Sequence, residues 1–257
     1  MTAQPAPSIT LPGLEGAAVA VTGGASGIGR ATVLLAARSG ATAIAGDVNP
    51  QMLDELDGLA RAEGLDVRCR RLDVRDPESV IEFVADADRD GNLRGAVNSA
   101  GISVDRPTLE VTDEFWDDVL RINLTGTFLV ARAAAERMVD RPGGGAIVNV
   151  SSNAGSAGRP LKAPYTSSKG AVIGLTKALA KEWGPRGVRV NCISPGAVDT
   201  PLRATHTTAH DVIGNLPLPR VGTPEELALA IGLFLTDLTP WVTGQTLNVN
   251  GGSMTYV

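Results

Sequence analysis

Short apolar runs alternate with longer amphipathic segments along most of this 257-residue chain. Seven of the runs are near-continuous in apolar residues, which predicts buried strands over residues 17–22, 41–47, 67–72, 95–98, 146–150, 188–193 and 246–249. The amphipathic segments between them predict helices over residues 27–39, 51–63, 77–88, 113–139, 163–183 and 224–236.

Regular alternation of strands and helices predicts an α/β fold, in which parallel strands form one doubly wound sheet and helices cover both of its faces. No internal repeat and no domain-scale linker interrupts the alternation. We therefore expect a single domain over residues 14–257, preceded by a disordered or loosely ordered tail at residues 1–13. In a sheet of this kind, with about seven strands, ligands bind at the carboxyl ends of the strands.

The composition is 43% hydrophobic and 20% charged, and no apolar stretch reaches the roughly 20 residues of a membrane-spanning helix. The formal net charge of −5 argues against a nucleic-acid partner, which needs a basic face. The first 13 residues lack a basic residue ahead of an apolar run, so no secretion signal is expected. Cys69 and Cys192 fall in predicted strands and are expected to be buried free thiols. These features favour a cytoplasmic protein that binds no membrane.

A glycine-rich turn follows the first predicted strand and leads into the first helix. Its sequence is TGGASGIG, from Thr22 to Gly29. Glycines permit a tight turn and close approach of the backbone, so a pyrophosphate can bind at the N-terminus of the helix. A phosphate loop for ATP or GTP has similar glycine spacing, but Arg30 and Ala31 stand where Lys and Ser/Thr are required. A nucleotide triphosphatase is therefore disfavoured, and a dinucleotide-binding unit of the Rossmann type is predicted.

An acidic residue, Asp47, ends the second predicted strand, 18 residues after Gly29. A carboxylate at this place accepts hydrogen bonds from the adenosine ribose hydroxyls and repels a 2′-phosphate. Neither Val48 nor Asn49 supplies the positive charge that a phosphorylated ribose requires. The sequence therefore favours NAD over NADP, and the alternative is that Asp47 is only a solvated residue at the end of a strand.

A series of short motifs with a shared order and spacing extends from Thr22 towards the C-terminus. The series contains the glycine turn, Asp73-Val74, Asn98-Ser99-Ala100-Gly101, Asn123, Ser152, the segment from Tyr165 to Lys169, Asn191, and the segment from Pro195-Gly196 to Thr200. In these residues the chain resembles the compact branch of the short-chain dehydrogenase/reductase family. The resemblance implies a Rossmann-type fold and hydride transfer between a nicotinamide cofactor and a secondary alcohol or its ketone.

Tyr165 and Lys169 are four residues apart in a predicted helix and therefore share one face. A free phenol has a pKa of about 10, and lowering it to about 7 takes about 4 kcal/mol of differential stabilisation. A neighbouring ammonium and the positive nicotinamide both favour the phenolate. We expect Tyr165 to exchange the hydroxyl proton of the substrate and Ser152 to hydrogen-bond the reacting oxygen. By resemblance, Lys169 also holds the nicotinamide ribose, and Asn123 maintains a water-linked proton path to Lys169.

The resemblance also implies the remaining contacts to the cofactor. They are Gly23, Ser26, Gly27, Ile28 and Gly29 in the turn, Asp47, Asp73 and Val74 at the adenosine, Asn98, Ala100 and Gly101 along the middle, and Pro195, Gly196, Val198 and Thr200 at the nicotinamide. The chain departs from the family pattern at Ser99, where a second asparagine is commoner, and at Asn250, where aspartate is usual. Neither departure touches the predicted chemistry.

His206 and His210 are four residues apart, a spacing that on a helix can hold a metal. The glutamate of the zinc-protease motif and a third ligand are missing from the sequence around them, so no metal is expected. Both histidines fall in the segment 200–217, where the family carries a substrate lid. Contact with the substrate and simple surface exposure both stay open for them.

The residues expected to form the substrate wall are mostly apolar, which favours a small or medium-sized apolar alcohol or ketone. They are Ile102, Ser103, Asn153, Ala154, Leu161, Leu202, Thr205, Thr207, Thr208, Val212, Ile213 and Leu216. A 3-oxoacyl-thioester reductase, a sugar dehydrogenase and a non-catalytic NAD-binding regulator stay open as alternatives. By resemblance, we expect a homotetramer or homodimer formed through the segments 113–139 and 163–183.

Overall fold

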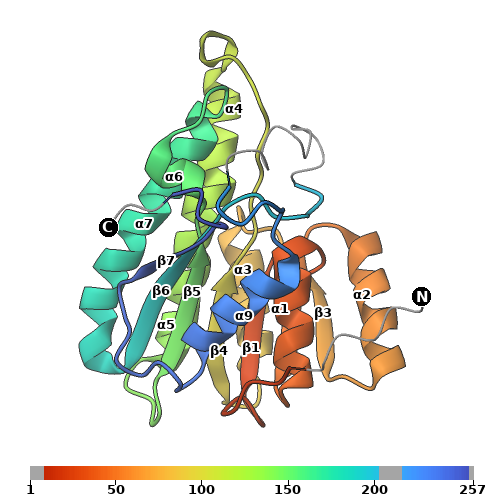
Figure 1. Cartoon of the computed structure of the whole chain (residues 1–257). Coiled ribbons are helices and arrows are strands. Elements are labelled where there is room, and N and C mark those ends of the chain that lie inside the picture. Colours follow the sequence, from red (N-terminus) through yellow and green to blue (C-terminus); the bar gives the residue numbers. More distant parts are fainter. Residues whose placement is uncertain (1–8, 203–215, 255–257) are drawn as a thin grey trace.

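A computed structural model describes residues 9–202 and 216–254. Within them, parallel strands form one seven-stranded sheet in the order β3-β2-β1-β4-β5-β6-β7 (Figure 1). The strands are β1 Ala18–Thr22, β2 Thr42–Asp47, β3 Val67–Arg71, β4 Leu93–Asn98, β5 Gly145–Val150, β6 Val188–Pro195 and β7 Thr246–Val249. Each pair of neighbouring strands is parallel, so the predicted doubly wound α/β sheet is confirmed.

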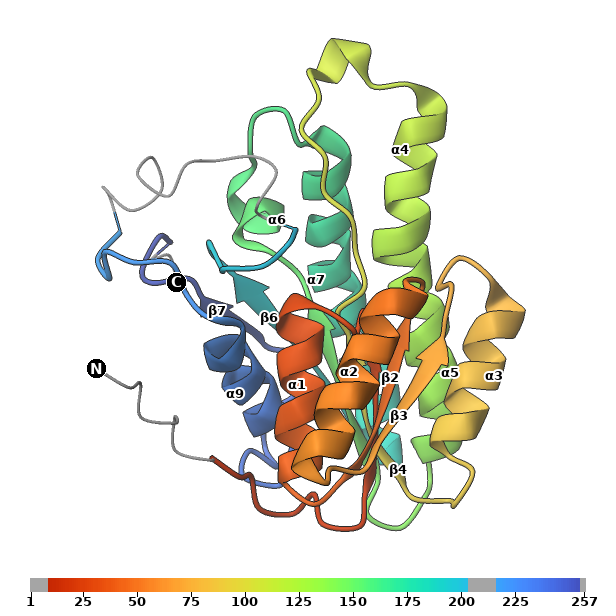
Figure 2. The same ribbon diagram turned by 90° about the vertical axis from the view of Figure 1, so that its right-hand side faces the viewer.

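Helices cover both faces of the sheet (Figure 2). One face packs against α1 Gly27–Arg38, α2 Pro50–Glu63 and α9 Pro224–Leu235. The other face packs against α3 Pro77–Ala87, α5 Thr127–Met138 and α7 Ala163–Trp183. Two shorter helices, α4 Asp113–Leu120 and α6 Asn153–Ala157, lie beyond the carboxyl ends of the strands. Hydrophobic clusters thus pack on both faces of the sheet and leave the carboxyl ends of its strands as the region where a ligand is expected.

Several helices begin and end at residues that satisfy their terminal backbone groups. The side chain of Asn49 accepts hydrogen bonds from two N–H groups at the start of α2, and Gly64 ends this helix in the left-handed conformation. Thr223 and Glu226 form a capping box at the start of α9. By contrast, the N-cap residue of α1, Ser26, makes no side-chain hydrogen bond to its helix. The first turn of α1 therefore presents N–H groups that no capping side chain satisfies.

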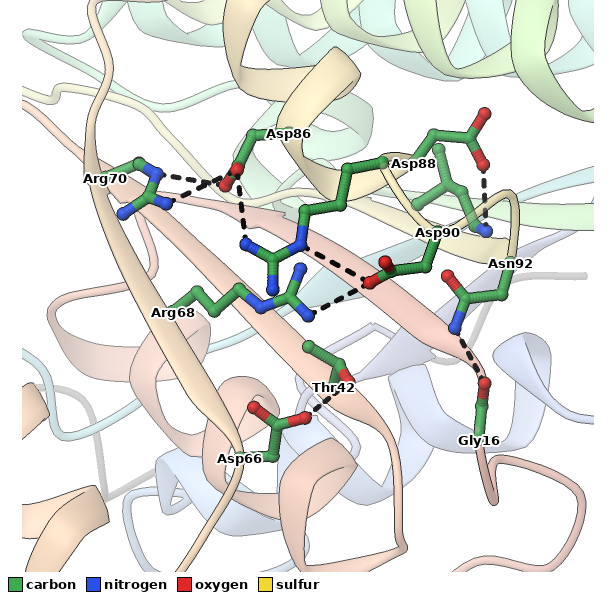
Figure 3. Close-up of polar contacts among 11 residues, drawn as sticks. Gly16, Thr42, Asp66, Arg68, Arg70, Asp86, Asp88, Asp90 and Asn92 are labelled. Carbon is green, nitrogen blue, oxygen red and sulfur yellow. Dashed lines mark hydrogen bonds and ion pairs between the residues drawn. The ribbon is translucent and has the colours of Figure 1, made fainter.

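The edge strand β3 differs from the continuous apolar strand that was predicted. Its sequence is VRCRR, and Cys69 is half-buried rather than buried, although both cysteines of the chain are free thiols as expected. Arg68 forms an ion pair with Asp90, just after α3, and Arg70 forms one with Asp86, within α3 (Figure 3). Charged side chains on an edge strand oppose its pairing with a strand of another molecule. The arginines thus explain why this strand is not apolar throughout.

The segment 113–139, predicted as one helix, contains a change of helix type. A π-helical segment, η2 Arg121–Gly126, joins α4 to α5. Such a segment inserts an extra residue into a helical turn and changes which side chains face the core. Asn123 lies in η2 and is fully buried.

Leu11, which falls in the predicted tail of residues 1–13, packs against the domain. This side chain is 7% exposed, and the Leu11 N–H donates a hydrogen bond of 2.9 Å to the hydroxyl of Ser39. A Cβ atom on Gly232 of α9 would lie 2.1 Å from the Leu11 side chain, so the helix carries a glycine where the leucine packs. Leu11 therefore belongs to the folded domain rather than to the loosely ordered tail that the sequence predicted.

Candidate active site

A cavity of about 780 Å³ opens beside the turn between β1 and α1 and extends to the N-terminal part of α7. Most of the residues predicted to bind cofactor or substrate line it. They are Gly23, Ser26, Gly27, Ile28, Asp47, Asp73, Val74, Ala100, Gly101, Ser152, Tyr165, Lys169, Pro195, Gly196, Val198 and Thr200. These residues follow the ends of β1 to β6 or belong to α7, so only the sheet order brings them together.

The glycine turn approaches neighbouring backbone too closely for side chains. Gly23 has a φ of +63°, and a Cβ on it would lie 2.9 Å from the backbone nitrogen of Ala100. A Cβ on Gly29 would lie 2.0 Å from the carbonyl oxygen of Gly23, so Gly29 closes the turn on itself and does not line the cavity. The turn delivers the uncapped start of α1 to the cavity, which is the geometry that binds a phosphate.

Asp47 connects the end of β2 to the glycine turn. Its carboxylate accepts hydrogen bonds from the N–H of Ala25, at 3.3 Å, and from the N–H of Asn49, at 3.1 Å. The same side chain lines the cavity. Asp47 is therefore more than a solvated residue at a strand end, because it fixes the turn and also lines the cavity.

A second carboxylate, Asp73, is bound by an arginine that the sequence reasoning missed. Arg75 donates from Nε and from a terminal nitrogen to the Asp73 carboxylate, at 3.0 and 2.7 Å. This pairing holds the pKa of Asp73 below its usual value. Both residues line the cavity, next to Asp47 in the sheet order. The only sequence signal for Arg75 was its position two residues after Asp73, a predicted cofactor contact, and this signal is weak.

Tyr165 and Lys169 lie one turn apart on α7, and both line the cavity. The Lys169 Nζ is 5.9 Å from the centroid of the Tyr165 ring. It donates a hydrogen bond of 2.8 Å to the carbonyl oxygen of Val150, at the end of β5. Ser152 follows two residues later and accepts a hydrogen bond of 3.2 Å from the N–H of Ala154, which fixes it at the start of α6. Helix α7 thus carries Tyr165 and Lys169, the start of α6 carries Ser152, and the three side chains line the same cavity.

Burial shifts the pKa values of both titratable groups in this set. It raises the pKa of Tyr165 above its usual value, and a hydrogen bond with Ser152 opposes that rise. It also lowers the pKa of Lys169 to about 8. Because its pKa is raised, the phenol is protonated at neutral pH in the protein alone, and the lowering expected from Lys169 stays a prediction.

Asn123 is buried behind the cavity and does not line it. Its Oδ1 accepts a hydrogen bond of 2.8 Å from the N–H of Ile102, and its Nδ2 donates to the Ile102 carbonyl at 3.0 Å and to the Ser168 hydroxyl at 3.1 Å. A Cβ on Gly101 would lie 3.1 Å from Asn123 Oδ1 and 3.4 Å from Lys169 Nζ. The amide and the ammonium thus both lie close to the position that a Cβ of Gly101 would take, and the predicted water path between them stays a prediction.

Asn98 was expected along the cofactor, but its side chain is turned into the protein. Its Nδ2 donates a hydrogen bond of 2.8 Å to Asn149 Oδ1, and the Asn149 amide donates to the Thr176 hydroxyl at 2.9 Å. All three side chains are buried, and Asn98 does not line the cavity. The side chain therefore ties β4, β5 and α7 together, and the expected cofactor contact of Asn98 stays a prediction.

The substrate end of the cavity is more polar than the sequence predicted. Ile102, Ser103, Asn153, Ala154, Leu202 and Leu216 line it as expected, whereas Leu161 does not. Two basic side chains, Arg159 and Lys162, also line the cavity and were not foreseen. Lys162 directly precedes α7 and lies three residues before Tyr165, a spacing that places neighbours on one side of a helix start.

His206 and His210 lie outside the described residues, as do Thr205, Thr207, Thr208, Val212 and Ile213 of the expected lid. Among residues 9–202 and 216–254, no group of three or more His, Cys, Asp or Glu side chains is arranged to hold a metal. The same residues contain no helix that is both long enough and apolar enough to cross a membrane.

Comparisons with known proteins show which proteins this chain is similar to. Residues 23–254 match the family described as enoyl-(acyl carrier protein) reductase. The chain is 39% identical over 244 residues to a 3-oxoacyl-[acyl-carrier-protein] reductase of Thermotoga maritima, covering 93% of this chain and 98% of the relative. It is 38% identical over 244 residues to a D-threitol dehydrogenase of Mycolicibacterium smegmatis, covering 93% of each. The crystal structure of gox2181 superimposes with a TM-score of 0.88 at 32% identity, covering 95% of this chain and 97% of that one.

Proposed function

Because the chain belongs to the short-chain dehydrogenase/reductase family, we propose that it transfers a hydride between NAD and a secondary alcohol or its ketone, with Tyr165 as the general acid and base. The observation that carries this proposal is the shared cavity. The glycine turn lines one end of it, and Tyr165, Lys169 and Ser152 line the other. A dinucleotide has the extended shape that such a cavity accepts.

The residues along the cavity fit a nicotinamide dinucleotide. The uncapped start of α1 offers N–H groups to the pyrophosphate, and Gly23 leaves room that a Cβ would fill. The Asp47 carboxylate is placed to accept hydrogen bonds from ribose hydroxyls. When bound, the cofactor supplies the hydride acceptor or donor, and the protein supplies binding, orientation and the proton.

During oxidation, the Tyr165 phenolate takes the proton of the substrate hydroxyl while a hydride leaves the carbon that bears this hydroxyl. Ser152 donates a hydrogen bond to the substrate oxygen and stabilises its developing charge. Because burial raises the pKa of Tyr165, the phenolate requires nearby positive charge, which Lys169 and an oxidised nicotinamide ring would both supply. In ketone reduction the protonated phenol is already the acid that the reaction requires.

The choice of NAD over NADP rests on the charges at the adenosine end. Asp47 presents a carboxylate there, which repels a 2′-phosphate. Arg75 is the cation that lines this end, and its guanidinium is bound in a two-point pair with Asp73. Asp73 offsets the charge of Arg75, so Asp47 leaves the described residues at this end with an excess of negative charge.

A 3-oxoacyl-thioester reductase is the second candidate, favoured by the 39% identity to the Thermotoga maritima protein. It would use the same tyrosine in the direction of reduction. A non-catalytic NAD-binding regulator would need neither Tyr165 nor Ser152 in the cavity, and both are there.

The test is Tyr165→Phe, with Tyr256→Phe as the matched control because the chain has only these two tyrosines. Turnover is followed by NADH absorbance with a panel of secondary alcohols and ketones, in parallel with NADP(H). We expect Tyr165→Phe to lose a factor of about 10²–10⁴ in kcat and to keep its affinity for NAD. Full activity of Tyr165→Phe would contradict the assigned role of the phenol.

The oligomeric state and the cytoplasmic location remain predictions. A homotetramer or homodimer formed through α4, α5 and α7 is expected, and analytical ultracentrifugation measures its mass directly. A monomer at micromolar concentration would contradict that expectation.

A further inference from the structure

The charges that line the cavity are distributed unequally between its two ends. Among the described residues, its lining carboxylates are Asp47 and Asp73, and both belong to the adenosine end. The substrate end is lined by two basic side chains, Arg159 and Lys162, in addition to Lys169. Asp105, which pairs with Lys162 from outside the cavity lining, offsets one of these three positive charges, and a cleft with an excess of one charge favours a ligand of the opposite charge.

The ammonium group of Lys162 is held in place by two contacts. Its Nζ lies 2.7 Å from Asp105 Oδ1 and donates a hydrogen bond of 2.8 Å to the Ser103 hydroxyl. The Lys162 side chain is only 14% exposed, and Asp105 does not line the cavity. A lysine ammonium has three N–H groups, so these two contacts leave one donor for a ligand in the cavity. Two fixed contacts also reduce the entropy that the lysine loses when it binds.

Lys162 is also close to the group proposed to exchange the proton. Its Nζ is 5.6 Å from the centroid of the Tyr165 ring, a separation similar to the 5.9 Å of Lys169. A substrate whose reacting oxygen meets the phenol therefore places atoms a few bonds further along within reach of Lys162. Arg159, three residues earlier, adds a second cation to the same side.

We propose that Lys162, assisted by Arg159, binds an anionic group of the substrate, so that the enzyme acts on hydroxy acids and oxo acids or on their phosphate counterparts. This assignment rests on the proposed dehydrogenase function and specifies its substrate class. It replaces the apolar alcohol that the sequence favoured, because the cavity carries two cations that the sequence did not place there. Lys162 is then a specificity-determining residue, separate from the proton exchange at Tyr165.

The test compares pairs of substrates that share the reacting ketone and differ in whether they carry an anionic group. The probes are 4-oxopentanoate and 5-oxohexanoate, their neutral methyl esters, and hydroxyacetone phosphate beside hydroxyacetone, all reduced with NADH. The variants are Lys162→Met, which removes the charge at similar length, and Lys162→Arg, which keeps it. Lys177→Met on the exposed side of α7 is the matched control, since Lys177 does not line the cavity.

We expect the wild type to prefer at least one anion over its neutral partner by tenfold or more in kcat/KM. Lys162→Met should raise KM for that anion about 10- to 100-fold and leave the neutral partner within a factor of about three, as a lost charge-assisted hydrogen bond requires. Lys162→Arg should restore much of the preference, and Lys177→Met should have no effect. Whether carboxylate or phosphate shows the selective loss identifies the anion.

Equal losses for the charged and neutral partners in Lys162→Met would overturn the proposal, since the lysine would then act on Tyr165 or on the fold. A wild type that reduces the neutral ketones as well as the anions would overturn it too, while leaving the dehydrogenase function intact. If no ketone is reduced with either cofactor, the proposed function fails, and calorimetric titration of the NAD-loaded protein with the same anions decides the inference separately. No binding there, or equal binding by Lys162→Met, refutes the anion site.

Discussion

The ammonium group of Lys169 is hydrogen-bonded to the carbonyl oxygen of Val150, 2.8 Å away, rather than to the phenol of Tyr165. This contact joins α7 to the end of β5 and holds the lysine in a site that is almost fully buried. Burial without a carboxylate partner disfavours the charged form of lysine. The pKa of Lys169 is accordingly lowered from 10.5 to about 8.

The first prediction concerns the pH dependence of stability. Because the pKa of Lys169 is lower in the folded protein than in the unfolded chain, the unfolded chain binds more protons between pH 8 and 10.5. The cost of burying the charge is fully present below pH 8 and is relieved as the pH rises through that interval. We expect the free energy of unfolding of the wild type to rise by about 3 kcal/mol relative to Lys169→Met over this range, measured by urea unfolding.

The comparison uses the change with pH and not the absolute stabilities, since Lys169→Met also leaves the Val150 carbonyl without its partner. Lys177→Met provides the control for removing an exposed lysine from the same helix. Parallel pH profiles for the wild type and Lys169→Met would show that Lys169 titrates at its usual pKa.

The second prediction concerns the choice of cofactor at Asp47. Asp47→Asn removes the negative charge and keeps one of the two oxygens, so it can still accept from the N–H of Ala25 or of Asn49, whereas Asp47→Ala removes both oxygens. We expect Asp47→Asn to raise the ratio of kcat/KM for NADP to that for NAD about tenfold, because the repulsion of a 2′-phosphate is lost. Asp47→Ala should in addition lower the thermal stability. A wild-type preference for NADP would contradict the role assigned to Asp47.

The third prediction uses two glycines that share a positive φ but differ in their surroundings. Gly23 and Gly13 have φ values of +63° and +84°, yet a Cβ on Gly23 meets the Ala100 backbone at 2.9 Å and one on Gly13 meets nothing within 4 Å. Gly13→Ala should therefore cost only the conformational strain, about 1 kcal/mol. Gly23→Ala should lower the unfolding temperature further and weaken NAD binding at least tenfold, by calorimetric titration. Equal effects of the two substitutions would mean that the close approach to Ala100 is unimportant.

The fourth prediction concerns the buried amide of Asn123. Asn123→Ala leaves the N–H and the carbonyl of Ile102 without partners in the interior, which should lower the free energy of unfolding by about 2–3 kcal/mol. Asn123→Asp keeps the acceptor for the N–H but loses the donor. If the amide also supports proton transfer at Lys169, kcat should fall in both variants by more than KM changes. A loss of stability with unchanged kcat would restrict Asn123 to a structural role.

The sequence by itself determined the features that depend on local pattern. Alternating apolar and amphipathic segments give the parallel sheet and its helices because burial on both faces requires continuous apolar strands. The turn from Thr22 to Gly29 is recognisable since only glycine tolerates such close backbone contacts. Tyr165 and Lys169 were placed together correctly because a spacing of four residues brings side chains onto one face of any helix.

The tertiary structure alone decided where polar side chains point and what they bind. Asn98 could serve a ligand or the interior, and its partner Asn149 lies on a strand that is adjacent only in the folded sheet. Lys162 enters the cavity because Asp105, distant in sequence, holds it there. Lys169 likewise donates a hydrogen bond to the Val150 carbonyl, which folding brings within reach. A buried polar group binds whichever partner the fold places beside it. The sequence alone does not contain the distance between such groups.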